Sequence, residues 1–233
     1  MTQSDHPRNQ LDQVICQIRY PAQLSIDRNM DLFQDRIRGD YPGYAQEQIV
    51  PIGVANPPGA GHIFTSPDGR WSINVSTGAM SLTTRTYRDW TDFESRFESV
   101  FDAFREVFGV DSFNRIGLRY INAIRPSALG LDAGADVILR GPVSELFTGG
   151  LGTFRGGSCI LDRDLDDGIS CRTAVGTIVF TDNCPGYAID NDVYTCRTVD
   201  GDDVITTLRR FNDISNRMFM EMASERLCRS VGL

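Results

Sequence analysis

The tripeptides Ile18-Arg19-Tyr20 and Leu118-Arg119-Tyr120 stand 100 residues apart, and this repeat constrains the fold more than any other feature of the sequence. Each tripeptide lies in a run where aliphatic and polar residues alternate, which is typical of a strand with one buried face. Each run stops at a proline, Pro21 or Pro126. Similar elements follow both prolines, so we expect the chain to consist of two related halves.

In the first half, the strand precedes a short helix, three antiparallel strands and an amphipathic helix. The short helix is indicated by apolar residues at Met30, Phe33 and Ile37. A capping box of Thr91 and Glu94 opens the longer helix, along which phenylalanines recur at helical spacing. We expect the three strands at residues 62–66, 71–77 and 80–87, and a loop-rich segment over residues 40–61.

The second half repeats this order of elements. A short helix is expected near residues 137–147, and a final helix of roughly 25 residues carries Asp203 in its first turn. Three longer strands are expected between these helices, at residues 153–163, 168–181 and 186–199.

The elements together predict an α+β fold. Neither half closes its own sheet, and no Ser/Gly-rich linker separates the halves. We therefore expect a single domain over residues 11–233, with long antiparallel sheets backed by two amphipathic helices. Its two pseudo-repeats cover about residues 11–110 and 111–233. Each consists of a strand, a short helix, three antiparallel strands and a long helix. Residues 1–10 are polar and are expected to form a disordered tail.

The charge and hydropathy of the chain exclude several classes of function. The net charge of −8 repels phosphate backbones, which argues against general nucleic-acid binding. No apolar run is long enough for a transmembrane helix, and the N-terminus lacks the apolar segment of a secretory signal. The sequence therefore predicts no membrane association and a cytoplasmic location, where cysteines stay reduced.

All 23 basic residues are arginine, so the chain is lysine-free. The absence of lysine excludes catalysis by a lysine nucleophile or a lysine Schiff base. Arginine instead favours planar, bidentate contacts with anions.

Arg19 and Arg119 are the candidate binding residues that the repeat singles out. Each lies on the strand face opposite the aliphatic residues, so neighbouring strands would place both on one face of a sheet. Two guanidinium groups there could hold a phosphate, a carboxylate or an acidic segment of a partner. The alternative is that acidic side chains of the same chain pair with both arginines.

Tyr20, Tyr120 and Asn122 are further candidate ligand- or partner-binding residues, on the apolar side of the two strands. Together with Trp71, the two tyrosines could line an apolar cavity between the repeats. A buried amide such as that of Asn122 must be hydrogen-bonded. It therefore either orients a ligand or ties down a neighbouring loop.

The sequence predicts no cofactor and no metal site. Four cysteines, from Cys159 to Cys196, follow one another at intervals of 12, 13 and 12 residues, unlike the close pairs of structural zinc sites. His62 is the one histidine outside the expected tail, which excludes a histidine cluster. Asp190 and Asp192 share a strand face and leave paired-carboxylate chemistry open.

Several blocks of residues resemble a sporadically distributed family of bacterial proteins about as long as this chain. The most specific block is Arg115-Ile116-Gly117-Leu118-Arg119-Tyr120-Ile121-Asn122. The others are Cys16-Gln17-Ile18-Arg19-Tyr20-Pro21, then Ser81-Leu82-Thr83-Thr84 with Tyr87, Trp90 and Phe93, and Ile189-Asp190-Asn191-Asp192-Val193-Tyr194. That family has no assigned activity, so the resemblance implies a bacterial cytoplasmic protein, and its patchy distribution would suit a mobile or defence-linked gene.

Three functions remain open from the sequence. The favoured one is a non-enzymatic binding or accessory protein that engages a protein partner or a small anionic ligand. The second is a sensor-like module that holds a small molecule between the pseudo-repeats, by analogy with SOUL and gyrase-inhibitor-like folds. The third is a metal-dependent hydrolase that uses Asp190 and Asp192.

Overall fold

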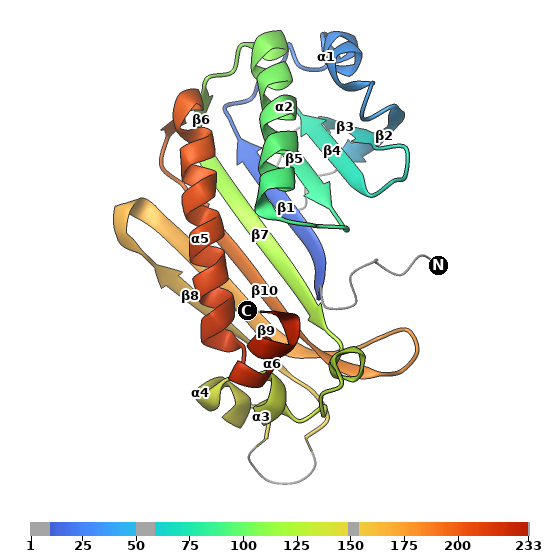
Figure 1. The fold of residues 1–233 in the computed structure, drawn as a ribbon. Coiled ribbons are helices and arrows are strands. Elements are labelled where there is room, and N and C mark those ends of the chain that lie inside the picture. Colours follow the sequence, from blue (N-terminus) through green and yellow to red (C-terminus); the bar gives the residue numbers. More distant parts are fainter. Residues whose placement is uncertain (1–9, 50–58, 149–153, 233) are drawn as a thin grey trace. The chain divides into compact units, whose positions relative to one another are not determined.

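A computed structural model describes residues 10–49, 59–148 and 154–232 (Figure 1). It confirms the α+β class, with antiparallel strand pairing and helices. The strands of the large sheet, in their order across it, are β2 (Gly43–Ile49), β3 (Gly59–Thr65), β4 (Trp71–Ser76), β5 (Ala79–Thr84), β1 (Leu11–Arg19), β7 (Arg115–Ile124), β10 (Pro185–Thr195), β9 (Ile169–Val179) and β8 (Ser158–Asp164). A small sheet pairs β6 (Ser112–Phe113) with β11 (Val199–Asp200).

The helices follow the order that the sequence predicts, with additional short ones in the second half. The α-helices are α1 (Met30–Ile37), α2 (Trp90–Phe108), α3 (Ala135–Ile138), α4 (Gly141–Glu145), α5 (Val204–Met222) and α6 (Glu225–Val231). Single 3₁₀ turns occupy Pro126–Leu129, Asp166–Gly168 and Gly201–Asp203. None of the described helices is both long and apolar enough to cross a lipid bilayer.

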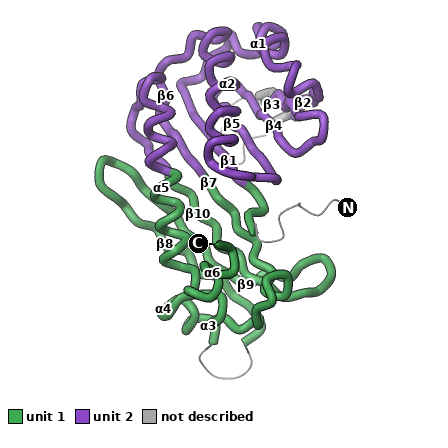
Figure 2. The backbone as a smooth tube through the Cα atoms, in the orientation of Figure 1, with its two compact units in different colours: residues 1–13, 119–193, 212–233 green, residues 14–118, 194–211 purple. Residues whose placement is uncertain are grey.

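The chain divides into two compact units, which do not coincide with consecutive halves of the sequence (Figure 2). Unit 1 comprises residues 1–13, 119–193 and 212–233, and unit 2 comprises residues 14–118 and 194–211. Strands β7 and β10 and helix α5 each contribute residues to both units. Each unit therefore draws on both of the expected pseudo-repeats.

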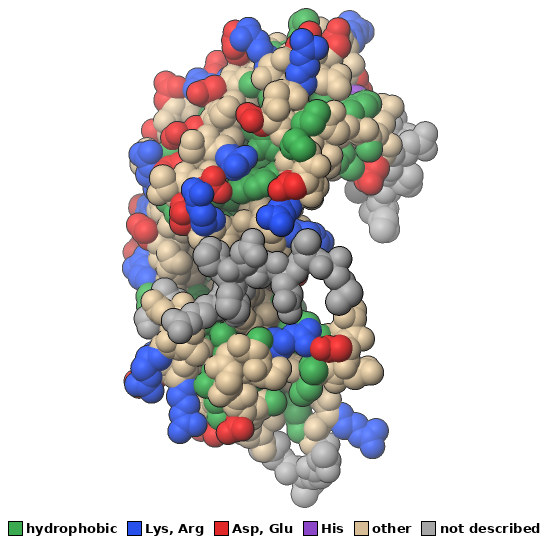
Figure 3. Space-filling model, turned by 45° about the vertical axis from the view of Figure 1, so that its right-hand side comes forward, with side chains coloured by type: hydrophobic (Ala, Val, Ile, Leu, Met, Phe, Trp, Pro, Cys, Tyr) green, Lys and Arg blue, Asp and Glu red, His purple; other side chains and the backbone are tan. Residues whose placement is uncertain are grey.

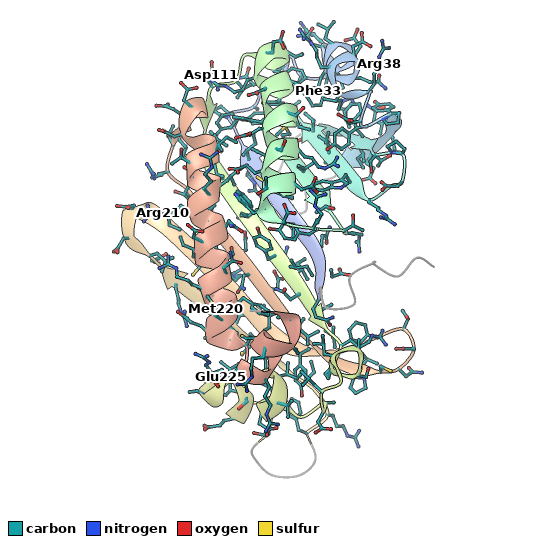
Figure 4. All side chains as sticks on the ribbon, in the orientation of Figure 1. Phe33, Arg38, Asp111, Arg210, Met220 and Glu225 are labelled. Atoms are coloured by element: carbon teal, nitrogen blue, oxygen red, sulfur yellow. The ribbon has the colours of Figure 1, made fainter. Side chains whose placement is uncertain are left out.

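Unit 2 is built around the phenylalanine-rich face of α2. Six apolar side chains of this helix are buried, and they pack over the inward faces of β1, β4 and β5. Phe33 of α1 joins this core, with its ring 5.6 Å from that of Phe108 and 5.7 Å from that of Phe64 (Figure 4). Helix α2 ends at Gly109, whose φ of 63° suits the left-handed turn that closes the helix.

The start of α2 differs from the expected capping box. The N-cap is Asp89, whose side chain accepts a hydrogen bond of 2.8 Å from the backbone N–H of Asp92. Thr91 therefore lies inside the first turn, and Glu94 is engaged elsewhere, by Arg209 of α5 at 2.6 Å. The prediction was wrong by two residues because an aspartate and a threonine both cap helices well, and Asp89 comes first.

Unit 1 buries one face of its strands under α3, α5 and α6. The apolar cluster at its centre contains Ile124, Val175 and Ile189 from the strands and Ile138 and Leu227 from the helices.

Gln10, at the end of the expected tail, belongs to unit 1. Its backbone carbonyl accepts from the N–H of Ala123 and its side chain accepts from the N–H of Arg125, both at 2.8 Å. The last residue of the expected tail is therefore part of the folded unit. Residues 1–9 of that tail lie outside the described residues.

Strand β2 corrects the expectation of loop over residues 40–61. It pairs antiparallel with β3, from Gly43 opposite Thr65 to Ile49 opposite Gly59. Tyr44 is exposed and polar residues follow it, so the strand lacks the apolar alternation by which strands are recognised. Residues 50–58 of the expected loop lie outside the described part of the chain.

The last helix is shorter than expected, because α5 stops at Met222 and α6 starts at Glu225. The break is fixed by the segment after α3. The N–H of Arg140 donates to the carbonyl of Met222 at 2.8 Å, and the N–H of Ser224 donates to the carbonyl of Ile138 at 2.9 Å. The Ser224 hydroxyl then caps α6 by accepting from the N–H of Leu227 at 3.0 Å. Helical periodicity continues across this break, so the sequence does not reveal it.

Candidate functional site

Arg119 forms a bidentate ion pair with Asp190 in unit 1. Its Nε donates to Oδ1 of Asp190 at 2.8 Å, and its Nη2 donates to Oδ2 at 2.6 Å. These hydrogen bonds raise the pKa of the guanidinium above its usual value, against the opposing effect of partial burial. Arg119 is therefore paired with a carboxylate of its own chain, as in the alternative to ligand binding given above.

A second bidentate pair lies on the same side of the unit 1 strands. Arg172 of β9 stands directly opposite Asp162 of β8, and its Nε and Nη2 donate to the two carboxylate oxygens at 2.7 and 3.0 Å. The bonds from Arg172 hold the pKa of the Asp162 carboxyl below its ordinary value. Both side chains are more than half exposed, at 58% and 57%.

Alternation along the strands puts these two pairs on one surface. In β7, β9 and β10, every second residue is mostly apolar and buried. The charged residues occupy the positions between them and therefore point to the opposite side of the sheet. We call the surface formed by Arg119, Asp162, Arg172 and Asp190 the charged face of unit 1. Ile160 of β8 lies beside Asp162 on this face and is 61% exposed.

Tyr120 and Asn122 lie on the opposite, helix-covered side of β7. The Tyr120 hydroxyl donates to Oδ1 of Asn212 on α5 at 2.8 Å. The buried amide of Asn122 donates to the carbonyl of Ile189 at 3.1 Å. Asn122 is therefore hydrogen-bonded, as a buried amide must be, but its partner is the neighbouring strand β10 rather than a loop.

More buried polar groups lie on the covered side of the unit 1 strands. Thr173 of β9 donates its hydroxyl proton to Oδ1 of Asn191 on β10 at 2.8 Å. The Asn191 amide nitrogen and the Ser215 hydroxyl of α5 have no hydrogen-bond partner among the described residues. No local pattern in the sequence marks these three polar groups as neighbours.

Arg19 and Tyr20 belong to unit 2. The exposed Arg19 donates from Nε to Oε1 of Gln17 at 2.9 Å, so its partner is an amide rather than a carboxylate. The Tyr20 hydroxyl is buried and donates to the carbonyl of Ser76 at 2.7 Å. Burial raises the pKa of this phenol, which therefore stays neutral. The ring packs 5.2 Å from that of Phe104 in the core of the unit.

The structure thus separates the five sequence-predicted residues. Within each tripeptide the arginine and the tyrosine point to opposite sides of the strand, and Arg19 with Tyr20 belongs to one unit while Arg119, Tyr120 and Asn122 belong to the other.

Trp71, the third residue of the expected cavity, lies in unit 2 with its ring 5.7 Å from that of Phe93. It is 6% exposed, so its ring is part of the packed core of that unit.

The carboxylates considered for a hydrolase are already engaged. Asp190 is bound by Arg119, and the charge of Asp192 also acts on that guanidinium. No group of three or more ligating side chains that could hold a metal ion occurs within residues 10–49, 59–148 and 154–232.

A constellation that the sequence did not predict surrounds His62 in unit 2. Its Nδ1 lies 3.0 Å from the Tyr44 hydroxyl, and its Nε2 lies 3.3 Å from Oδ1 of Asp27. The imidazole is buried, whereas Tyr44 is 49% exposed. The sequence drew attention to His62 but not to its two partners, because β2 was not predicted and Asp27 is 35 residues away from His62 in the chain. The lone histidine beyond the expected tail was the signal that could have led to them.

Comparison of the chain with models of known protein families and with curated proteins found no significant match.

Proposed function

We propose that this chain is a non-enzymatic binding protein that engages a protein partner through the charged face of unit 1. The observation that supports this proposal is that two bidentate Arg–Asp ion pairs lie on the same exposed side of the unit 1 strands. Exposed ion pairs contribute only about 0–1 kcal/mol to folding. Their more effective use is in recognition, where fixed charges of both signs select and orient a partner.

A protein partner suits this surface better than a small anion. An anion would have to displace the Asp190 carboxylate, which already occupies two donors of Arg119. A protein can instead add its own acidic and basic groups to the existing pairs and cover Ile160. Figure 3 shows arginine and acidic side chains interspersed on the visible surface, without a broad patch of one sign.

We further propose a reducing, cytoplasmic location for this function. All six cysteines are unpaired thiols, and Cys16 and Cys171 are buried. Burial raises the pKa of both thiols, which keeps them protonated and unreactive.

The test is affinity capture from the native host with the tagged protein, read out by mass spectrometry for proteins and small molecules. The double variant Arg119→Ala/Arg172→Ala removes one member of each pair and should lose the captured partner. Arg209→Ala is the matched control, since it also breaks an exposed pair of 2.6 Å, but one that joins two helices of unit 2. It should retain the partner.

Capture of the same partner by the double variant, with unfolding midpoints in urea equal to wild type, would overturn the proposal. A single variant, Arg19→Ala, adds a separate comparison. It should leave capture unchanged, because Arg19 lies in unit 2.

A further inference from the structure

The protonation of His62 follows from its two neighbours. An ionised aspartate can only accept hydrogen bonds, so Asp27 requires a proton on Nε2 of the imidazole. In the neutral imidazole, Nδ1 then carries a lone pair. The Tyr44 hydroxyl, 3.0 Å away, is the donor to that lone pair.

Tyr44 differs from other tyrosines of the chain in the group that accepts a hydrogen bond from its hydroxyl. The hydroxyls of three other tyrosines donate to carbonyl oxygens, in the pairs Tyr20 with Ser76, Tyr120 with the Asn212 side chain and Tyr187 with Ala133. A carbonyl oxygen is too weak a base to take a proton. An imidazole is the side chain that most often takes up a proton in catalysis, so His62 can accept the Tyr44 proton during a reaction.

The three side chains are held by ordered parts of unit 2. Tyr44 lies opposite Phe64 in the β2–β3 register, with the two rings 5.3 Å apart, and its ring also stacks on His62. Asp27 follows the fully buried Ile26 in a turn closed by backbone hydrogen bonds. Nucleophile, base and orienting carboxylate therefore need no rearrangement to act together.

We infer that Tyr44 is a nucleophile that accepts an acyl group from an activated carboxylic ester. His62 acts as its general base, and Asp27 is the residue that positions His62. All three lie in unit 2, so this reactivity is independent of the charged face of unit 1. It is stoichiometric, one acyl group per chain, and so goes beyond the binding function without requiring turnover.

The charge around the site favours an acyl donor over a phosphoryl donor. The Asp27 carboxylate lies 3.3 Å from Nε2 of the imidazole, and the chain as a whole carries a net charge of −8. Both repel a phosphoryl group, which brings its own negative charge. A carbonyl carbon is neutral, and the half-exposed phenol leaves room for it to approach.

In the reaction, the Tyr44 oxygen attacks the carbonyl carbon while its proton moves to Nδ1 of His62. The bond from the carbonyl carbon to the leaving oxygen then breaks, and that oxygen takes the electron pair. The proton on Nδ1 returns to the leaving group if it is basic enough, and otherwise passes to solvent. The products are an aryl ester on Tyr44 and the leaving group, which is a neutral alcohol or phenol if it takes the Nδ1 proton and an anion if that proton passes to solvent. Nε2 stays hydrogen-bonded to Asp27.

The probe is p-nitrophenyl acetate, with release of p-nitrophenolate followed by absorbance and the acetyl group located by tandem mass spectrometry. The chain suits this probe because it has no lysine to compete for the acetyl group. We expect Tyr44 to be acetylated about 100-fold faster than N-acetyltyrosinamide at the same pH, because a positioned general base contributes about that factor. His62→Gln should lower this rate by about 100-fold, the usual contribution of a general base. Tyr44→Phe should abolish the modification.

Asp27→Asn keeps the proposal testable if His62→Gln does not fold, because the Asp27 side chain is 45% exposed. It should lower the rate of acetylation, because the imidazole loses the carboxylate that orients it, and Asp27→Glu should restore much of that rate. Equal acetylation of Tyr44 in wild type and the folded His62→Gln variant would overturn the inference. So would an unchanged rate in Asp27→Asn, or an acetyl group found on His62 instead of Tyr44.

Discussion

At the scale of single residues, Thr173 and Asn191 illustrate the cost of polar groups in a core. Both side chains are buried, and one hydrogen bond of 2.8 Å joins them. A buried acceptor that loses its donor costs about 1–3 kcal/mol, whereas removing both partners together costs far less.

Thr173→Val should therefore lower the free energy of unfolding by about 1–3 kcal/mol, because the Asn191 oxygen is left without a donor. The double variant Thr173→Val/Asn191→Leu should be more stable than the sum of the two single losses predicts. Urea denaturation of all four proteins measures this coupling. Strict additivity would show that the hydrogen bond contributes nothing specific.

The sequence predicted some of the site at this scale. Alternation of aliphatic and polar residues correctly put Arg119 on one side of its strand and Tyr120 with Asn122 on the other. It could not tell which carboxylate meets Arg119, because Asp190 is 71 residues away and only strand order brings the two together. The constellation around His62 was missed for the same reason, since no local spacing encodes it.

At the scale of elements, the first turn of α2 depends on an ionised cap. The hydrogen bond from the backbone N–H of Asp92, followed by that from Arg88, holds the pKa of the Asp89 carboxyl below its usual value. A carboxyl with a lowered pKa stabilises the fold above the pKa that it has in the unfolded chain, about pH 4. This stability disappears as the pH falls through the lower, folded-state pKa.

Asp89→Asn should remove that part of the acid sensitivity while keeping the helix capped, because asparagine accepts the same hydrogen bond without titrating. The midpoint temperature of thermal unfolding should fall less steeply for the variant than for wild type as the pH is lowered from about 5 to about 2. Asp213→Asn, on the exposed side of α5, controls for the loss of one negative charge. Identical pH slopes for Asp89→Asn and wild type would contradict the assignment.

The break between α5 and α6 gives a second prediction for an element. Ser224→Ala removes the hydroxyl that accepts from the N–H of Leu227 and donates to the carbonyl of Val137. The unfolding free energy should fall by about 1–3 kcal/mol, and amide exchange in α6 should accelerate.

The control for this prediction is Asn216→Ala, at an exposed position of α5. It also removes a small polar side chain, but it should change stability by only about 0.5 kcal/mol or less. Equal effects of the two substitutions would argue against the capping role of Ser224.

Elements with a strong periodic pattern were predicted well, and those without one were not. Helix α2 was evident from its phenylalanines, and the three strands of each half were found close to their observed positions. Strand β2 and the break after Met222 depend on partners from other parts of the chain, namely β3 and the segment after α3. No pattern within a short stretch of sequence can show such partners.

At the scale of the whole molecule, the two units share four elements, because β1, β7, β10 and α5 each contribute residues to both. Val204, Leu208 and Phe211 of α5 are buried and belong to unit 2, whereas Ile214 and Met218 of the same helix are buried and belong to unit 1. A cut between the expected pseudo-repeats would therefore leave unit 2 without part of its core, whereas unit 1 would lose only residues 1–13.

Residues 11–110 expressed alone should lack the near-ultraviolet circular dichroism of a packed aromatic core, because the parts of β7 and α5 that belong to unit 2 are missing. Mixing the two fragments should restore the signal of the intact chain. A native-like spectrum from the first fragment by itself would instead make the pseudo-repeat an independent domain.

Strand β8 has a consequence for how the protein behaves at high concentration. It ends the large sheet, so its outer edge has no partner strand among the described residues. An open edge that carries an exposed Ile160 is a template for aggregation. Asp162 and Asp164 lie on the same side of this strand, and their charges repel a second copy that approaches in register. In a chain without lysine, aspartate protects this edge, so replacing Asp162 and Asp164 with asparagine should lower the solubility of the protein.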